Sequence, residues 1–556
     1  MAEHLPTMEE RQAALREAFS GVPECSGCRR DERMLPSHDS IELFTVCFFP
    51  TDIPSPWPTV VQRCCYPRDI PLLETQGELY ARRGFAMVYQ MCRGTGRSQG
   101  TWEPNVNERD DGLALMAWLQ GQDWAGPIGY YGASYLALTG WAMADAVPDK
   151  VKTMFLSVYG TERHTSAWEN GLFRQDILTA WAMGNAGHPV TADLMESCRY
   201  RPQVQVDEAL WGGRLPWYRD WITHPDGSDP YWREGFWGML REIPGKVKLP
   251  VYVVDGWYDH HLGSALRTWE NLSDAAKAHS RLEIYPGNHG FAPAIYGHPE
   301  AKRAVYSPER NALAWFTEIL RDGCLPEPWV RYYAVGEDCW KSCPAYPFPE
   351  RNKRTFYLGN GTLDSKPGPA GERSYTYDPD NPVETLGAES LFAHFDSTGS
   401  REIQPPNWRP DVLSFLSEPL NAPVPVLGKP RVKLFVRSDA PDTCFTVKLA
   451  EQFPDGRSFH IRNGITTLCR HKRGQAPQSY DGGTVELDLE TWDIAWTLQR
   501  GSRLRIDISS SNFPEYSIHP NTTVLWSEAA EVKTAHQTVF FGGNTPACVE
   551  LPVDMG

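Results

Sequence analysis

The pattern of apolar and polar residues divides the chain into segments of different character. Over residues 1–160, short apolar runs alternate with stretches whose apolar residues recur at helical spacing, which is typical of a mostly parallel sheet covered by helices. Strands are predicted at residues 41–49, 59–64, 85–89 and 128–131. The spacing of Leu113, Met116 and Leu119 predicts a helix over residues 109–120.

The next segment, residues 161–244, is rich in Trp, Arg and turn residues and lacks strong strand runs, so we expect a helical insertion there. Strand character returns at residues 249–255 and 282–285, with a helical pattern between them. Residues 1–160 and 245–345 are therefore predicted to form one discontinuous α/β domain that the insertion interrupts.

The last segment, residues 346–556, has frequent Pro and Gly and short runs in which apolar and polar residues alternate. Short strands separated by turns predict an all-β sandwich or jelly-roll domain. The predicted strands include residues 432–436, 444–449, 484–489, 504–508 and 539–541.

Composition and charge narrow the class of protein. The chain has 556 residues, which indicates two or three domains, and its 41% hydrophobic and 22% charged residues are typical of a globular protein. A net charge of −16 argues against a nucleic acid or a membrane surface as partner. Association of the chain with copies of itself is an alternative that the charge does not exclude. The sequence lacks an apolar stretch of about 18 residues and a secretory pattern at its N-terminus, so we expect a cytoplasmic protein.

The cysteines do not form a repeating framework. There are 13 of them, an odd number in a chain too large to need disulfides, so we expect reduced thiols. Cys25 and Cys28 are the one pair at a spacing used by metal and redox sites. No second pair follows at a zinc-finger spacing, which favours a surface loop over a zinc or redox site.

Ser134 is the strongest candidate for a catalytic group. An apolar run ends in Gly132-Ala-Ser134, and a helical pattern follows at once. A strand, small residues around a Ser and then a helix are the context of a nucleophile elbow, where the tight turn exposes the hydroxyl at the edge of a sheet. Leu136 stands where many elbows have a second Gly, so the triplet alone is weak support.

Asp259 and His289 are predicted to complete a catalytic triad with Ser134. A Ser hydroxyl needs a base to take its proton, and the base needs an acid to hold its tautomer. In α/β-hydrolases the order along the chain is Ser, acid, His, and each residue follows a strand. Asp259 and His289 both follow predicted strands in this order, although a helix-capping Asp and a loop His are the simpler alternatives.

Three neighbouring residues are rival candidates for the same roles. Asp255 is an alternative acid, but it directly adjoins an apolar run and is interpreted as structural. His260 and His261 are alternative bases, yet neither follows a strand of its own.

At this point the chain resembles a known family, the cocaine esterase and X-Pro dipeptidyl-peptidase superfamily, which includes α-amino acid ester hydrolases and cephalosporin acylases. The resemblance covers most of the chain from about residue 35 to about residue 525. It rests on Arg93-Gly-Thr-Gly-Arg-Ser-Gln-Gly, Gly132-Ala-Ser-Tyr-Leu, Gly256-Trp-Tyr-Asp, Pro286-Gly-Asn-His, Asp442-Thr-Cys-Phe-Thr-Val-Lys-Leu, Phe453-Pro-Asp-Gly-Arg and Ser509-Ser-Ser-Asn-Phe-Pro-Glu-Tyr.

The resemblance implies an α/β-hydrolase core with an inserted helical cap and a C-terminal jelly-roll domain. It also implies an oxyanion hole formed by the hydroxyl of Tyr66 and the backbone N–H of Tyr135. Ala137 and the pair His260-His261 depart from the family pattern, and we expect the histidines to narrow or charge the mouth of the site. Candidates for the walls of the substrate pocket are Trp168, Phe173, Trp181 and Phe291.

The predicted function is hydrolysis of an ester or amide through an acyl-enzyme, without a metal or organic cofactor. Two variants use the same triad, a dipeptidyl-peptidase and an acyltransferase. The peptidase would need a carboxylate in the insertion to hold a free amine, for which Glu162, Glu169 and Asp176 are available. The competing class is a non-catalytic protein whose jelly roll binds carbohydrate or another protein.

Overall fold

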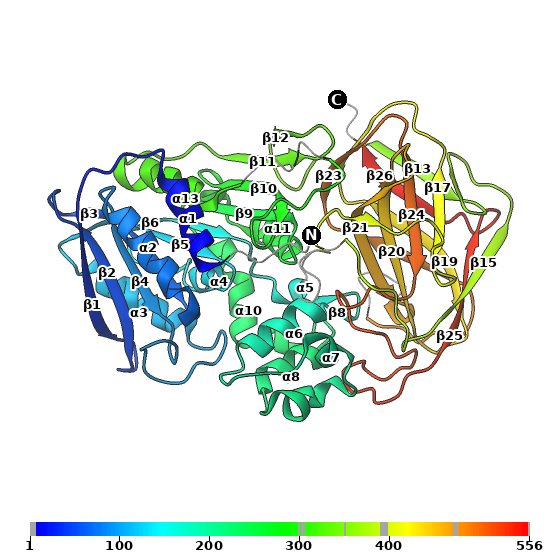
Figure 1. The fold of residues 1–556 in the computed structure, drawn as a ribbon, viewed down its shortest axis with the longest axis horizontal. Helices are drawn as coiled ribbons and strands as arrows, with labels where there is room; N and C mark the ends of the chain where they lie inside the picture. Colours follow the sequence, from blue (N-terminus) through cyan, green and yellow to red (C-terminus); the bar gives the residue numbers. More distant parts are fainter. Residues whose placement is uncertain are drawn as a thin grey trace.

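A computed structural model describes residues 7–298, 301, 306–349, 352–387, 389, 398–470 and 476–553. Figure 1 shows two large β-sheets side by side, with a group of helices between them at the lower edge of the view. The first sheet and its helices come from the N-terminal half of the chain and the second sheet from the C-terminal half. Within the described residues, no helix has both the length and the apolar character that a membrane span requires.

The first sheet has ten strands in the order β1-β2-β4-β3-β5-β6-β9-β10-β11-β12. Its centre is parallel, from β4 to β11, while β1, β2 and β12 pair antiparallel at the edges. The strands are β1 (Cys28–Pro36), β2 (Glu42–Pro50), β3 (Trp57–Cys64), β4 (Ala86–Met91), β5 (Ala125–Ala133), β6 (Val151–Ser157), β9 (Val251–Tyr258), β10 (Arg281–Asn288), β11 (Trp329–Ala334) and β12 (Cys339–Cys343). Central strands such as β4 and β9 are buried along their whole length, as expected where helices cover both faces.

Helices cover both faces of this sheet. The buried residues of α1 (Met8–Phe19), α2 (Ile70–Ala81) and α13 (Pro308–Phe316) belong to one apolar core. Those of α3 (Glu108–Gln120), α4 (Tyr135–Trp141) and α11 (Leu262–Asn271) belong to a second core on the other side. The arrangement brings the carboxyl ends of β5, β9 and β10 to one edge, which is where open α/β sheets place their sites.

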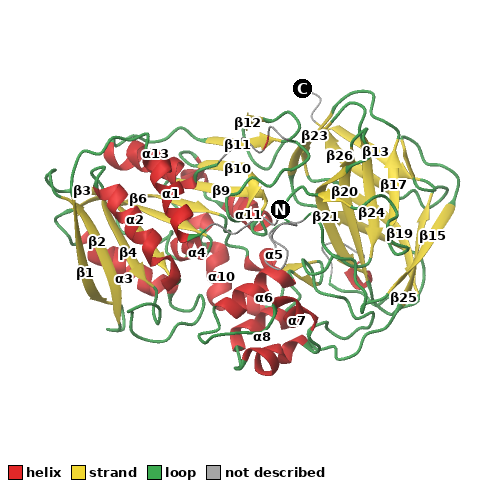
Figure 2. Cartoon of the chain, viewed as in Figure 1, coloured by secondary structure: helices red, strands yellow, loops and turns green. Residues whose placement is uncertain are grey.

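The helical insertion, residues 161–244, leaves the sheet after β6 and returns at β9. It contains α5 (Arg163–Ala167), α6 (Gln175–Gly184), α7 (Leu194–Arg199), α8 (Pro216–Thr223), α9 (Pro230–Arg233), α10 (Gly235–Glu242) and a small hairpin of β7 (Trp168–Glu169) and β8 (Leu172–Phe173). In Figure 2 this region is almost entirely helix and loop.

Arg174 joins the insertion to the C-terminal half. Its side chain is buried and donates to Glu169 Oε2 at 2.6 Å and to Glu389 Oε2 at 3.4 Å. The guanidinium also lies 4.2 Å above the ring of Trp492 and 3.7 Å from Glu515 Oε1. Burial and the neighbouring Glu389 raise the pKa of Glu515, so Arg174 binds an acid pair that shares one proton.

The second sheet has fourteen strands, most of them antiparallel, and forms the C-terminal half. Buried and exposed positions alternate along β19 and β25, which is the pattern of strands with one face in a core. Its strands are β13 (Asn352–Leu358), β14 (Thr362–Asp364), β15 (Gly371–Tyr377), β16 (Glu402–Ile403), β17 (Leu413–Ser417), β18 (Val424–Gly428), β19 (Arg431–Ser438), β20 (Cys444–Gln452), β21 (Ser458–Thr467), β22 (Val485–Glu490), β23 (Ile494–Leu498), β24 (Arg503–Ser509), β25 (Ala535–Phe541) and β26 (Cys548–Val553).

The region around Cys25 and Cys28 differs from the expected surface loop. Cys25 is exposed in a loop, but Cys28 is half-buried and opens strand β1, opposite Pro50 of β2. Both are free thiols. Strand β1 was not predicted, because most of its residues are charged and few are apolar. It is stabilised by pairing with β2 at the edge of the sheet rather than by burial of its side chains.

Candidate active site

Ser134 sits in a strained turn between β5 and α4. Its backbone has φ 56° and ψ −128°, a conformation that non-glycine residues rarely adopt. A Cβ atom on Gly132 would lie 2.2 Å from the carbonyl oxygen of Leu136, so only glycine fits two positions before the serine. This is the geometry of a nucleophile elbow, formed without a second glycine after the serine.

Ser134, His289 and Asp259 form a continuous chain of hydrogen bonds. The Ser134 hydroxyl lies 2.9 Å from His289 Nε2, and His289 Nδ1 lies 2.7 Å from Asp259 Oδ2. Ser134, His289 and Asp259 follow β5, β10 and β9, which all run parallel in the centre of the sheet, so the three residues lie at one edge of it. With a proton on Nδ1 directed at Asp259, Nε2 is free to accept the proton of the hydroxyl.

Asp255 and Asp259 differ in their contacts. Asp259 is fully buried, and its second oxygen accepts the backbone N–H of His261 at 2.6 Å. Asp255 is also buried, but it accepts only the backbone N–H of Gly256, at 2.8 Å, and bonds to no histidine among the described residues. Burial, together with the charge of Asp259, raises the pKa of Asp255 well above its usual range, which favours the protonated form.

His260 and His261 are both buried in the wall beside His289. Their rings lie 4.7 Å and 5.7 Å from the His289 ring, and His261 Nδ1 lies 2.8 Å from the hydroxyl of Ser166. Burial lowers the pKa of both side chains well below the usual range, so they are neutral at pH 7. The expectation that they charge the mouth of the site is therefore wrong, because they are held inside it in the uncharged form.

Tyr66 and Tyr135 line the same pocket as Ser134, and each carries a hydrogen-bond donor. Tyr66 follows β3, and its hydroxyl oxygen accepts a 3.0 Å hydrogen bond from Trp181 Nε1 in α6. Burial raises the pKa of Tyr66 well above its usual range, so its hydroxyl keeps its proton. The backbone N–H of Tyr135, at the start of α4, makes no hydrogen bond to any other residue that the structure describes. Both could donate to an oxyanion formed at Ser134.

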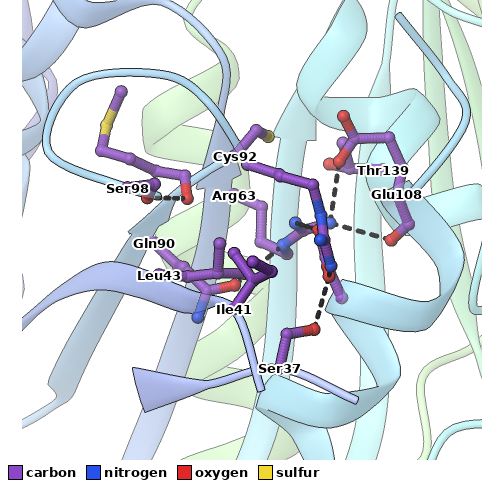
Figure 3. Close-up of polar contacts among 12 residues, drawn as sticks. Ser37, Ile41, Leu43, Arg63, Gln90, Cys92, Ser98, Glu108 and Thr139 are labelled. Atoms are coloured by element: carbon purple, nitrogen blue, oxygen red, sulfur yellow. Dashed lines mark hydrogen bonds and ion pairs between the residues drawn. The ribbon is translucent and has the colours of Figure 1, made fainter. Parts of the chain in front are cut away.

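A buried polar network contacts the side-chain hydroxyl of Tyr135. The Tyr135 hydroxyl donates to Glu108 Oε1 at 2.8 Å, and Glu108 Oε2 accepts from Arg63 Nη1 at 2.9 Å. Arg63 also donates to Gln90 Oε1 at 3.1 Å, and Figure 3 shows Arg63 between Gln90 and Glu108. With Tyr135, the network links β3, β4, α3 and α4. Sequence reasoning missed these residues; the available signal was a charged Arg63 inside an apolar predicted strand.

A pocket of about 190 Å³ opens next to Ser134 and His289. Its apolar wall is formed by residues of the insertion, including Ile177, Leu178, Trp181 and Trp221. The insertion therefore covers the reacting groups and supplies most of the apolar surface that a substrate would meet.

Of the four predicted pocket-wall residues, only Trp181 lines this pocket. The indole of Trp168 donates to a backbone carbonyl of α8. Phe173 stacks on Trp526 of the C-terminal half, with 5.8 Å between ring centroids. Phe291 packs on Tyr285, with 5.4 Å between ring centroids, at the border of the core that α1, α2 and α13 share. These three aromatic side chains belong to apolar cores, which are as rich in aromatic residues as pockets are.

One group of side chains has the donor atoms to hold a metal ion. Among the described residues, ligand atoms of Asp259, His260 and His289 lie within 4.8 Å of one another. An ion there would take the lone pairs that Asp259 and His289 use in the hydrogen-bond chain to Ser134, so metal binding and that chain exclude each other.

Two known protein domains match this chain, one in its N-terminal half and one in its C-terminal half. Residues 39–291 match the X-Pro dipeptidyl-peptidase (S15 family), and residues 323–550 match the X-Pro dipeptidyl-peptidase C-terminal non-catalytic domain. The two matches account for the strand-rich C-terminal half as a non-catalytic domain that follows a catalytic one.

Individual relatives match over nearly the whole length. The cocaine esterase of Rhodococcus sp. (strain MB1 Bresler) is 29% identical, over 94% of this chain and 97% of that protein. An α-amino acid ester hydrolase has the same fold, with a TM-score of 0.80 at 20% identity, covering 96% of this chain and 99% of that one. An aminopeptidase from a marine sediment archaeon, Thaumarchaeota archaeon, matches with a TM-score of 0.78 at 17% identity, covering 100% of this chain and 98% of that one. The chain belongs to the cocaine esterase and X-Pro dipeptidyl-peptidase superfamily and is a serine hydrolase.

Proposed function

We propose that this enzyme hydrolyses esters of small acyl groups through an acyl-enzyme, with Ser134, His289 and Asp259 as its catalytic triad. The observation that carries the proposal is the unbroken hydrogen-bond chain from the Ser134 hydroxyl through His289 to Asp259. The strained elbow at Ser134 and the free N–H of Tyr135 support it independently.

The proposed reaction has two halves. His289 Nε2 takes the proton of Ser134 as Oγ attacks the acyl carbon, and the Tyr66 hydroxyl and the Tyr135 N–H stabilise the tetrahedral oxyanion. Collapse of that intermediate expels the alcohol, which takes the proton from His289, and leaves Ser134 acylated. Water then attacks the acyl-enzyme with His289 again as base, releasing the acid and restoring the serine. Asp259 stays ionised and holds the His289 ring in the required tautomer.

An ester substrate is favoured over an N-terminal dipeptide by the charges around the pocket. In the described chain, no Asp or Glu lines the pocket where a substrate amine would have to bind. Glu162 is bound to Arg241, and Glu169 is bound to Arg174 and to the hydroxyl of Tyr516. An acyltransferase variant differs only in the nucleophile of the second half-reaction and remains the alternative on the same triad.

We also propose the domain limits. Residues 1–160 and 245–345 would form the α/β-hydrolase domain, residues 161–244 its cap, and residues 346–556 a jelly-roll domain. The ten-stranded sheet with helices on both faces, the helices between β6 and β9, and the antiparallel strands after residue 345 support this division.

The test is hydrolysis of p-nitrophenyl acetate through octanoate, phenylglycine methyl ester and Gly-Pro-p-nitroanilide by the wild type and by Ser134→Ala. We expect turnover of the esters that disappears in Ser134→Ala, and labelling of the wild type alone by a fluorophosphonate. Ser166→Ala is a matched control, because this buried serine contacts His261 rather than His289. A wild type that neither turns over any ester nor reacts with the fluorophosphonate would contradict the proposed triad.

A further inference from the structure

Arg163 is a buried cation in the wall of the catalytic pocket. It begins α5 at the start of the insertion, and only 7% of the residue is exposed. It lines the same pocket as Ser134 and His289. Its guanidinium lies 4.5 Å from the centroid of the Trp221 ring, which also lines the pocket, and 5.9 Å from that of Trp237.

Arg163 has no counter-ion within the part of the chain that the structure describes. Its Nε is buried without a hydrogen-bond acceptor. Burial raises the pKa of Tyr159 to about 12 although the nearby Arg163 lowers it, so a neutral phenol is the polar group beside the guanidinium. The adjacent Glu162 is directed instead at Arg241, with which it forms an ion pair.

The other groups around the pocket do not neutralise this charge. Arg68 is a second cation in the wall, over the ring of Tyr66. His260 and His261 are neutral, and the positive charge of Arg163 is one of the causes that keep their pKa low. The described lining contains no Asp or Glu. The pocket is therefore positively charged around an apolar interior.

A buried guanidinium without an anion is costly, and stacking on tryptophan offsets only part of that cost. Trp221 lies against the guanidinium of Arg163, and Tyr159 is a neutral hydrogen-bond partner, but the buried Nε still lacks an acceptor. A carboxylate is the acceptor that fits two parallel N–H groups best, and the ion pair gains strength where water is excluded.

We propose that Arg163 binds a carboxylate of the substrate, so that the enzyme prefers esters that carry a negative charge. This inference rests on the proposed esterase function and names the substrate class for that site: an ester with a free carboxylate on its acyl chain or on its alcohol. Arg163 acts as a specificity-determining residue and takes no part in proton transfer.

Two series of chromogenic or phenyl esters of matched size test the preference. For the acyl side, these are the p-nitrophenyl monoester of adipic acid, p-nitrophenyl hexanoate and p-nitrophenyl 6-(trimethylammonio)hexanoate. For the alcohol side, they are 3-acetoxybenzoate, phenyl acetate and 3-acetoxy-N,N,N-trimethylanilinium. We expect kcat/KM for the anion to exceed that for the neutral ester by at least about tenfold in one series, and the cation to be the poorest substrate in both.

Variants then assign the preference to Arg163. Arg163→Gln should lower kcat/KM for the anion by at least about tenfold more than kcat/KM for the neutral ester, and Arg163→Lys should keep part of the preference. Arg199→Gln is the matched control, because Arg199 lies in the same insertion but does not line the pocket. Fluorophosphonate labelling checks that each variant has an assembled site.

Three outcomes would overturn the inference. One is a wild type that labels and hydrolyses neutral esters but shows no preference for the anion in either series. Another is an Arg163→Gln variant that loses activity equally on all esters, which would make Arg163 structural. The third is an unchanged preference in Arg163→Gln. Absence of both labelling and turnover in the wild type would instead contradict the esterase function itself.

Discussion

Trp181 in the insertion donates a 3.0 Å hydrogen bond to the hydroxyl oxygen of Tyr66, which follows strand β3 of the sheet. The indole occupies a lone pair of that oxygen, so the Tyr66 proton is directed away from Trp181 and is available to another acceptor. The ring of Trp181 also stacks on that of Tyr135, 5.9 Å away. One residue of the insertion therefore contacts both proposed oxyanion donors and lines the pocket beside them.

Replacement of Tyr66 by Phe should lower kcat by about 10²–10³, because one of two oxyanion donors is lost, with little change in KM. The assay is steady-state hydrolysis of p-nitrophenyl butyrate. Trp181→Phe removes the indole N–H and part of the ring system but keeps an aromatic ring in the pocket and both oxyanion donors, so its kcat should fall less. A Tyr66→Phe enzyme with the kcat of the wild type would remove Tyr66 from the mechanism.

Replacement of Asp259 by Asn should lower kcat on the order of 10⁴, because the amide no longer holds the tautomer of His289 that accepts the serine proton. Asp255→Asn is the matched control four positions away. Since the raised pKa of Asp255 favours its protonated form, an uncharged amide of the same shape should leave kcat nearly unchanged. Equal losses in the two variants would show that the acid has been assigned to the wrong residue.

Gly132→Ala should prevent the nucleophile elbow from forming. The added methyl group would lie 2.2 Å from the Leu136 carbonyl oxygen, which belongs to rigid backbone, so the turn must shift. We expect loss of fluorophosphonate labelling and a lower thermal midpoint. Gly121→Ala, where the nearest atom is 3.5 Å away and φ is −83°, should label like the wild type.

The stability of the enzyme should fall as the pH drops below about 6.5. His460 in β21 is fully buried, and burial, together with the charge of Lys448, lowers its pKa to about 3 despite the nearby Glu389 and its contact with Asn463. Between pH 6.5 and 3, His460 is protonated in the unfolded chain but not in the folded chain, so the free energy of unfolding decreases as the pH falls. His460 alone should lower the free energy of unfolding by about 2 kcal/mol between pH 6.5 and 5.

The measurement is the thermal midpoint at pH 7 and at pH 5 for the wild type and for His460→Gln. The wild type should lose stability on acidification, and the variant should lose less, since glutamine does not titrate. Equal shifts in the two proteins would mean that His460 does not bind its proton in this range when the chain unfolds.

Sequence patterns predicted the parts of the site that depend on strand ends. An apolar run followed at once by Ser134, Asp259 or His289 places each residue at the carboxyl end of a strand, and the structure brings the three within hydrogen-bond distance. The predicted strands also agree with those of the structure in type and approximate position. Strand β6 was not predicted, although it lies between β5 and β9 in the sheet.

The pocket wall could not be predicted in the same way. Side chains of the insertion are positioned by packing between short helices, and Trp168 and Trp181 are equally apolar but contact different partners. The link from Arg63 to Glu108 joins a strand to a helix 45 positions away, and no local pattern encodes that contact. Arg163 was missed for a related reason, because only the fold reveals a charge without a counter-ion.

The attachment of Arg174 to Glu389 and Glu515 has a consequence for how such chains can change in evolution and in the laboratory. Arg174 of the insertion contacts carboxylates that loops of the C-terminal half supply, more than 200 positions further along the chain. Exchanging the helical insertion to obtain a new specificity would remove Arg174 from Glu515 and leave Glu389 with Arg462 as its cation partner. A successful chimera would therefore have to transfer the insertion together with the residues of the C-terminal half that Arg174 contacts.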